Sequence, residues 1–138
     1  MEPLGPETPH WQGRIAVKVA SLPPQTFSAN FELYGGAKAG NMALTSTLGT
    51  TMARMQWNAE GADLQAGGST RAFQTLDALT LATVGAELPV GAMIEWLQGK
   101  AAQADGWQED LSQWDDGRIS AHRYGTEPRV DLKLVLER

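Results

Sequence analysis

The side chains that could support catalysis are few, and their spacing fits no catalytic pattern. The chain of 138 residues has no cysteine and only two histidines, His10 and His122. A metal site generally needs three or more convergent ligands, and acid–base or nucleophilic catalysis needs a base placed beside its partner. His10 lies in a proline-rich start and His122 in a segment of alternating polarity, so both are expected to be ordinary surface or structural residues. We therefore predict no catalytic residue, no metal site and no cofactor.

Two other segments resemble functional motifs only superficially. The stretch QEDLSQWDDG, residues 108–117, contains four acids that would suit a calcium loop or a glycosidase carboxylate pair. Its spacing matches no calcium-loop pattern, and Asp115 and Asp116 are explained by the turn that they occupy. The glycine-rich stretch YGGAKAG, residues 34–40, lacks the order of a phosphate-binding loop and is not followed by a helical pattern. Both segments are expected to be ordinary connections.

Composition limits the class of protein. The net charge is -5 and the computed isoelectric point about 4.9, so the basic surface that nucleic-acid binding requires is absent from the sequence. No apolar run approaches the roughly 20 residues that span a bilayer. The length suits one domain, and three prolines without periodicity mark the first ten residues as a separate arm. We expect a flexible N-terminal arm at residues 1–10, a single domain at residues 11–138, and a monomer.

The first half reads as a meander of about five strands. Residues 14–19 and 26–34 alternate apolar and polar side chains, with Ile15, Val17 and Val19 on one face of the first segment. Residues 41–45, 51–57 and 62–66 continue the pattern. The connections are too short for parallel crossovers, so the strands are expected to be antiparallel.

Two short helices and three more strands are expected to follow. Thr75 is a candidate N-cap and Gly85 a candidate stop for one helix; Pro89 opens a second, which Gly99 ends. Residues 106–114, 118–124 and 129–136 read as strands, the first two joined by a hairpin at DDG. The order predicts an α+β fold in which one curved antiparallel sheet carries helices across a face or mouth. Such a sheet encloses space that either side chains or a ligand must fill.

Large and adaptable apolar side chains are frequent in this chain. Five tryptophans and five methionines are present, mostly on apolar faces. Methionine suits surfaces that accommodate variable apolar partners, although a plain core would use the same residues. Composition alone does not decide between a core filled by side chains and a cavity for a ligand. It also leaves open whether Leu48, at the tip of a predicted turn, packs back on its hairpin or forms an exposed contact site.

Several motifs together resemble one known family. These are TSTLGTTMARMQW at residues 45–57, LPVGAMIEWLQG at residues 88–99, GRIAVKV at residues 13–19, DGW at residues 105–107 and the alternating C-terminal strand. The chain is similar over nearly its whole length to LolB, the outer-membrane lipoprotein receptor of Gram-negative bacteria. The resemblance implies an incomplete antiparallel β-barrel with a lid of short helices over an apolar cavity, and no enzymatic activity.

The family's task is then the expected function. In this family the protein accepts acylated lipoproteins from the periplasmic carrier LolA, binds their acyl chains in the cavity and inserts them into the inner leaflet of the outer membrane. A general periplasmic carrier of lipids or other apolar ligands is an alternative on the same fold. A third hypothesis is a structural or interaction domain whose barrel is filled by side chains.

The resemblance also assigns roles to residues. A leucine on a protruding loop serves membrane delivery in the family, and Leu48 holds that position, flanked by Gly49 and by Thr47, where family members usually have proline. Apolar alternation and the resemblance together give the candidate lining of the cavity and lid: Phe27, Phe31, Met42, Met55, Trp57, Leu79, Met93, Ile94, Trp96 and Leu134.

The expected location is the periplasmic side of the outer membrane. Family members are held there mainly by lipid on an N-terminal cysteine, and the present sequence has no cysteine. One fully buried leucine contributes only about 1.5–3 kcal/mol, which is too little for an anchor. We expect a natural precursor with a leader and a lipidated cysteine upstream, and a soluble domain in their absence.

Overall fold

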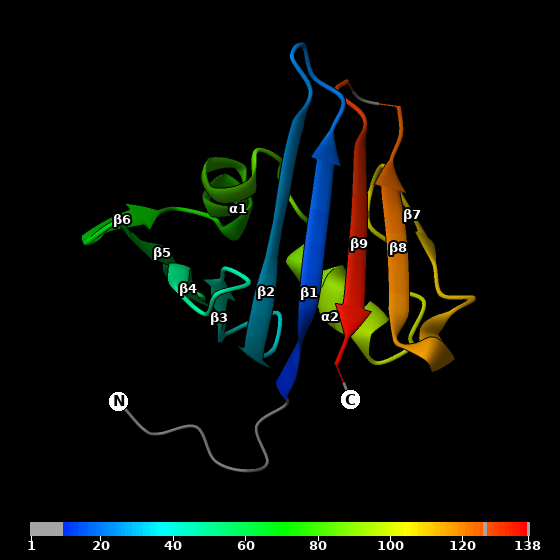
Figure 1. Cartoon of the computed structure of the whole chain (residues 1–138), viewed down its shortest axis with the longest axis horizontal. Coiled ribbons are helices and arrows are strands. Elements are labelled where there is room, and N and C mark those ends of the chain that lie inside the picture. Colours follow the sequence, from blue (N-terminus) through cyan, green and yellow to red (C-terminus); the bar gives the residue numbers. More distant parts are fainter. Residues whose placement is uncertain (1–9, 126, 138) are drawn as a thin grey trace.

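A nine-stranded antiparallel sheet curves around two short helices in the computed structural model, which describes residues 10–125 and 127–137 (Figure 1). The strand order is β6-β5-β4-β3-β2-β1-β9-β8-β7. In the described residues the edge strands β6 and β7 do not pair with each other, so the barrel is incomplete. The strands are β1 (His10–Val19), β2 (Gln25–Gly35), β3 (Gly40–Thr45), β4 (Thr51–Asn58), β5 (Gly61–Ala66), β6 (Ser69–Phe73), β7 (Trp107–Asp110), β8 (Arg118–Arg123) and β9 (Val130–Leu136).

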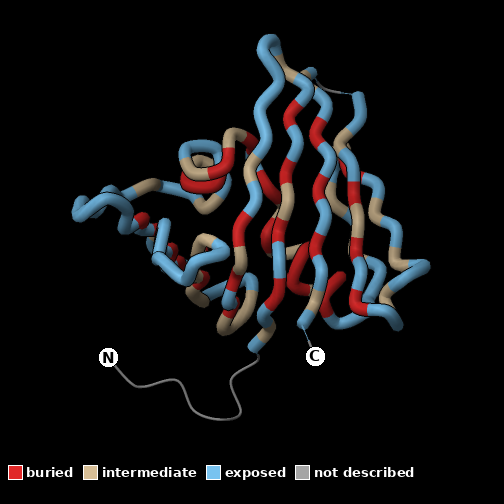
Figure 2. Tube along the Cα trace, viewed as in Figure 1, coloured by how far each residue is buried: buried red, intermediate tan, exposed pale blue. Residues whose placement is uncertain are grey.

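Alternation of apolar and polar residues gives the sheet one buried and one exposed face. In β1 the side chains of Ile15, Val17 and Val19 are buried, while Arg14 and Lys18 are exposed (Figure 2). A period of two places successive side chains on opposite faces. The first and last strands pair along the middle of the sheet, and this pairing joins the N-terminal meander to the C-terminal strands.

The two helices begin and end at the residues that the sequence predicts. Helix α1 (Leu76–Val84) is capped by Thr75, whose side chain accepts a hydrogen bond from the Ala78 N–H at 3.1 Å, and ends at Gly85 with φ 86°. Helix α2 (Val90–Leu97) follows Pro89. The fully buried Thr80 hydroxyl accepts from the Leu88 N–H at 3.0 Å and so ties the linker between the helices to α1.

Both helices lie on the concave side of the sheet. Figure 1 shows α2 behind β1 and β9, with α1 near one end of β2. Their inward side chains belong to the same buried apolar cluster as those of the strands. In the described part of the chain, neither helix has the length and apolar character needed to cross a membrane. This arrangement confirms the predicted incomplete barrel with a helical lid.

Strand β6 was not predicted. It pairs with β5 through the two-residue turn Gly67–Gly68, in which both glycines have positive φ. Only Phe73 of this strand is even half-buried, so the strand lacks the alternation that identified the others. The N-terminal meander therefore has six strands and not five.

The acidic segment also differs from prediction. Strand β7 stops at Asp110, and a 3-10 turn, η1 (Trp114–Asp116), follows before β8. Asp110 is already paired with Ser120 in the ladder, so DDG ends a longer loop and does not form a tight hairpin. The predicted arm lies outside the described residues except for His10, which is the first residue of β1 and not part of a loose arm.

Candidate functional site

The ten predicted lining residues come from both layers of the fold. The sheet contributes six and the helices four, and together they face the space between sheet and lid. Phe27 and Phe31 lie on β2, Met42 on β3, Met55 and Trp57 on β4, Leu134 on β9, Leu79 on α1, and Met93, Ile94 and Trp96 on α2. All belong to one apolar cluster or pack against it.

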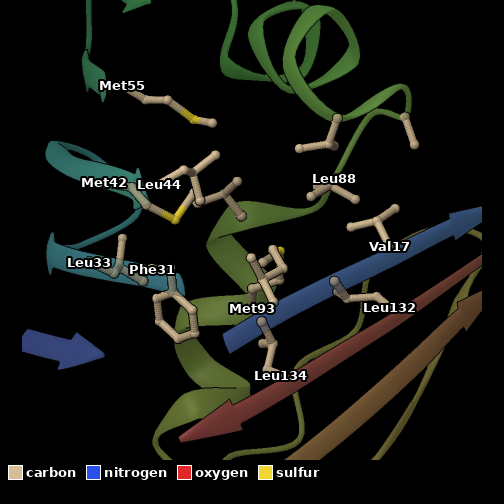
Figure 3. Packing of buried hydrophobic residues seen from close by; sticks show 14 of the residues in the cluster. Val17, Phe31, Leu33, Met42, Leu44, Met55, Leu88, Met93, Leu132 and Leu134 are labelled. Atoms are coloured by element: carbon tan, nitrogen blue, oxygen red, sulfur yellow. The ribbon is translucent and has the colours of Figure 1, made fainter. Parts of the chain in front are cut away.

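Side chains from sheet and helices fill this space. Phe27 is half-buried, and each of the other nine lining residues has 5% or less of its surface exposed. Figure 3 shows Met93 of α2 on the same inner side as Phe31 of β2 and Leu134 of β9. The two layers therefore touch directly along the lining.

The indole N–H groups of the lining form hydrogen bonds, and neither bond runs between the sheet and the helices. The Trp57 indole N–H donates to the Gly36 carbonyl at 2.8 Å, and the Trp96 indole N–H donates to the Ala102 carbonyl at 2.9 Å. Both bonds are made to backbone in the loops at the rim. The indole rings thus present only apolar surface to the interior, which is what a site for hydrocarbon requires.

The start of α2 rests closely against the link between β2 and β3. A Cβ added at Gly91 would lie 3.3 Å from the Ala37 Cβ. Because only glycine lacks this atom, Gly91 lets α2 approach the link more closely than other residues would allow. The contact marks one place where the lid touches the rim of the sheet.

Leu48 stands apart from the cluster, at the tip of the turn between β3 and β4. Its side chain is 93% exposed. Ser46 closes the turn: its carbonyl accepts from the Gly49 N–H at 2.9 Å, its N–H donates to the Thr50 carbonyl at 2.9 Å, and its hydroxyl accepts from the Thr50 N–H at 3.2 Å. Gly49 has φ 87°, a left-handed conformation that glycine adopts without strain. These bonds hold the turn with threonine at position 47 in place of proline.

The sequence analysis did not single out two further residues. Leu22, in the turn between β1 and β2, is 98% exposed. Arg123 follows Ile119 and Ala121 on the inner face of β8 at the end of the strand. Parity along the strand is the signal that would have placed Arg123 inward, since residues two apart share a face.

The groups set aside as catalytic candidates have structural partners. His10 stacks on Tyr34 with ring centroids 4.2 Å apart, and His122 lies 6.2 Å from the Tyr124 ring. Hydrogen bonds from the Ser112 side chain and backbone lower the pKa of Asp110. Across residues 10–125 and 127–137, no three histidine, aspartate or glutamate side chains gather as a metal site would require.

Comparison with known proteins gives a consistent result. The model of the family described as outer membrane lipoprotein LolB matches residues 9–132. Outer-membrane lipoprotein LolB of Bordetella petrii is 29% identical, over 90% of this chain and 75% of that protein. The protein of the same name from Thiobacillus denitrificans is 31% identical, over 92% of this chain and 71% of that protein. Outer-membrane lipoprotein LolB of Shewanella woodyi is 34% identical, over 68% of this chain and 43% of that protein. The region that the family model matches includes both helices, the Leu48 turn and nine of the ten lining residues, all except Leu134.

Proposed function

Since this chain belongs to the LolB family of outer-membrane lipoproteins, we propose that it accepts acylated lipoproteins from a LolA-like periplasmic carrier and inserts them into the inner leaflet of the outer membrane. The family acts in lipoprotein localisation at the outer membrane and is not a family of enzymes. The observation that carries the proposal is the packing of two short helices, by apolar side chains, on a concave apolar sheet face.

Acyl chains would bind between the helices and the sheet. Because the lining residues of the two layers now touch, α1 and α2 must move outward to admit a chain. The bound acyl chain then takes over the apolar contacts that the helices made with the sheet. Its transfer from water contributes about 0.8 kcal/mol for each methylene. Hydrocarbon contacts require no particular polypeptide sequence, so cargo proteins of different sequence are accepted.

The Leu48 turn would make the contact with the bilayer. Thr45, Thr47, Thr50 and Thr51 surround the leucine with uncharged hydroxyl groups suited to the headgroup region. A single leucine contributes roughly 1.5–3 kcal/mol when it is buried. That is enough for a transient contact during delivery and too little for permanent attachment.

No energy source is needed for the transfer. A carrier passes cargo to any site that binds the cargo more favourably, and a bilayer is the final acceptor. The direction therefore follows from increasing affinity along the series of carrier, receptor and membrane.

The test is the transfer of a triacylated lipoprotein in two separate steps. The purified domain is mixed with a LolA-like carrier that holds the lipoprotein, without nucleotide, and the cargo is expected to move onto the domain. Liposomes added next are expected to receive it. Cargo that stays on the carrier, while the domain binds free fatty acid tightly, would instead indicate a general carrier of apolar ligands.

A further inference from the structure

Arg123 is an unusual residue for the inner face of the sheet. It ends β8, opposite Trp107 and Val130, which are both buried. Its Nη2 donates to the Pro128 carbonyl at 2.7 Å, which fixes the guanidinium group at the rim. Its Nε is buried and has no hydrogen-bond partner among the described residues. Buried donors without partners are rare because they lose their bonds to water, so this one needs an explanation.

A pocket of about 530 Å³ adjoins Arg123 at the mouth between lid and sheet. Its other walls are the start of α1, the linker from α1 to α2 with the start of α2, and the loop before β7. Leu88, Val90 and Trp107 give it an apolar floor. These three residues belong to the same buried cluster as the lining, so the pocket lies at the edge of that cluster, where the polar end of an acyl ligand would stay.

The charges around the pocket restrict what that polar end can be. Asp77, Glu87 and Asp105 line the pocket, and Arg123 is its one cation within the described residues. Three carboxylates at the mouth disfavour an anionic headgroup or a free fatty-acid carboxylate. A guanidinium donor still binds an uncharged carbonyl oxygen well, because bonds to a charged donor are stronger than bonds between neutral groups.

We propose that Arg123 binds the uncharged ester or amide carbonyl at the polar end of an acyl ligand and, with the three surrounding carboxylates, selects neutral acyl esters over acyl anions. This inference rests on the proposed acyl-chain function and adds a headgroup preference to it. In the structure Arg123 Nε is shielded from solvent. The ligand carbonyl therefore reaches Nε only when the linker between α1 and α2 moves aside. The ligand then satisfies the donor that closure leaves unpaired.

The test compares two ligands that share one hydrocarbon chain. Binding of monooleoylglycerol and of oleate is measured at pH 8, together with diphenylhexatriene, a hydrocarbon probe without a headgroup. The wild-type domain is expected to prefer monooleoylglycerol over oleate. In Arg123→Met the affinity for monooleoylglycerol is expected to fall by about tenfold, with diphenylhexatriene binding unchanged. Arg118→Met, an exposed arginine on the same strand, is the matched control and should change neither.

Two further variants keep the test decisive if Arg123→Met does not fold. Arg123→Lys retains the charge but loses the Nε donor, and it should also weaken monooleoylglycerol binding. Glu87→Gln, at an exposed position, should strengthen oleate binding and leave monooleoylglycerol unaffected. Unchanged ester affinity in the Arg123 variants, or no effect of Glu87→Gln on oleate, would overturn the headgroup preference. Failure of the wild type to bind diphenylhexatriene would instead contradict the acyl-chain function itself.

Discussion

Replacing Leu48 with glutamate is expected to slow delivery of lipoprotein to liposomes by about tenfold or more, while uptake from the carrier stays unchanged. Leu48 is 93% exposed, so the change removes no core packing. It removes a side chain whose burial contributes roughly 1.5–3 kcal/mol and puts a carboxylate where the apolar contact should form. Cargo recovered with floated liposomes over time measures delivery; cargo recovered with the domain measures uptake.

Leu22→Glu is the matched control for this variant. It makes the same change in another turn, at a leucine that is 98% exposed. Both steps should proceed as in the wild type. Equal slowing of delivery by both variants would mean that any added acid on a turn repels the membrane, and the specific role of Leu48 would be lost. Loss of uptake together with delivery in Leu48→Glu would indicate damage to the fold.

A disulfide between the lid and the sheet rim is expected to block cargo uptake. The double variant Ala37→Cys, Gly91→Cys places two Cβ atoms near 3.3 Å, close to the separation that a disulfide spans. The chain has no other cysteine to compete. With α2 tied to the link between β2 and β3, this helix cannot move outward. Uptake from the carrier should fall by about tenfold or more after oxidation and return after reduction.

Each single-cysteine variant controls for the substitution itself and should take up cargo under both conditions. Thermal unfolding of the oxidised double variant verifies that the domain remains folded. If the oxidised double variant took up cargo at the wild-type rate, acyl chains would have to enter without movement of α2. The lid role proposed for this helix would then be wrong.

Most of the fold could be predicted because its strands have one buried face. Ile15, Val17 and Val19 alternate with polar residues, and Thr75 and Gly85 are local signals that mark a helix regardless of tertiary contacts. Strand β6 gave no such signal, because its positions are exposed apart from the half-buried Phe73. The end of β7 was misplaced because loop geometry after Asp110 depends on hydrogen bonds that the residue pattern does not encode.

The candidate site could be predicted in part. Apolar alternation and the family resemblance together gave candidate lining residues, and the structure places all of them in or against one apolar cluster. The residue pattern alone left open whether Leu48 packs back on its hairpin, and the structure shows that it is exposed. Arg123 was missed because the pocket beside it forms only when the helices and the loop before β7 pack next to β8. These segments are far apart in the sequence, so the residue pattern does not reveal the pocket. Only the folded protein shows that its Nε has no hydrogen-bond partner among the described residues.

The most direct test of acyl-chain binding between lid and sheet is photolabelling with a lipoprotein whose acyl chain carries a diazirine near its end. After transfer to the domain and irradiation, mass spectrometry identifies the labelled residues. We expect label on the inner lining, at Met93, Trp96 and Leu134. Label confined to outer-face residues such as Lys18 and Lys133, or its absence from a domain that holds cargo, would contradict the account and favour a barrel filled permanently by its own side chains.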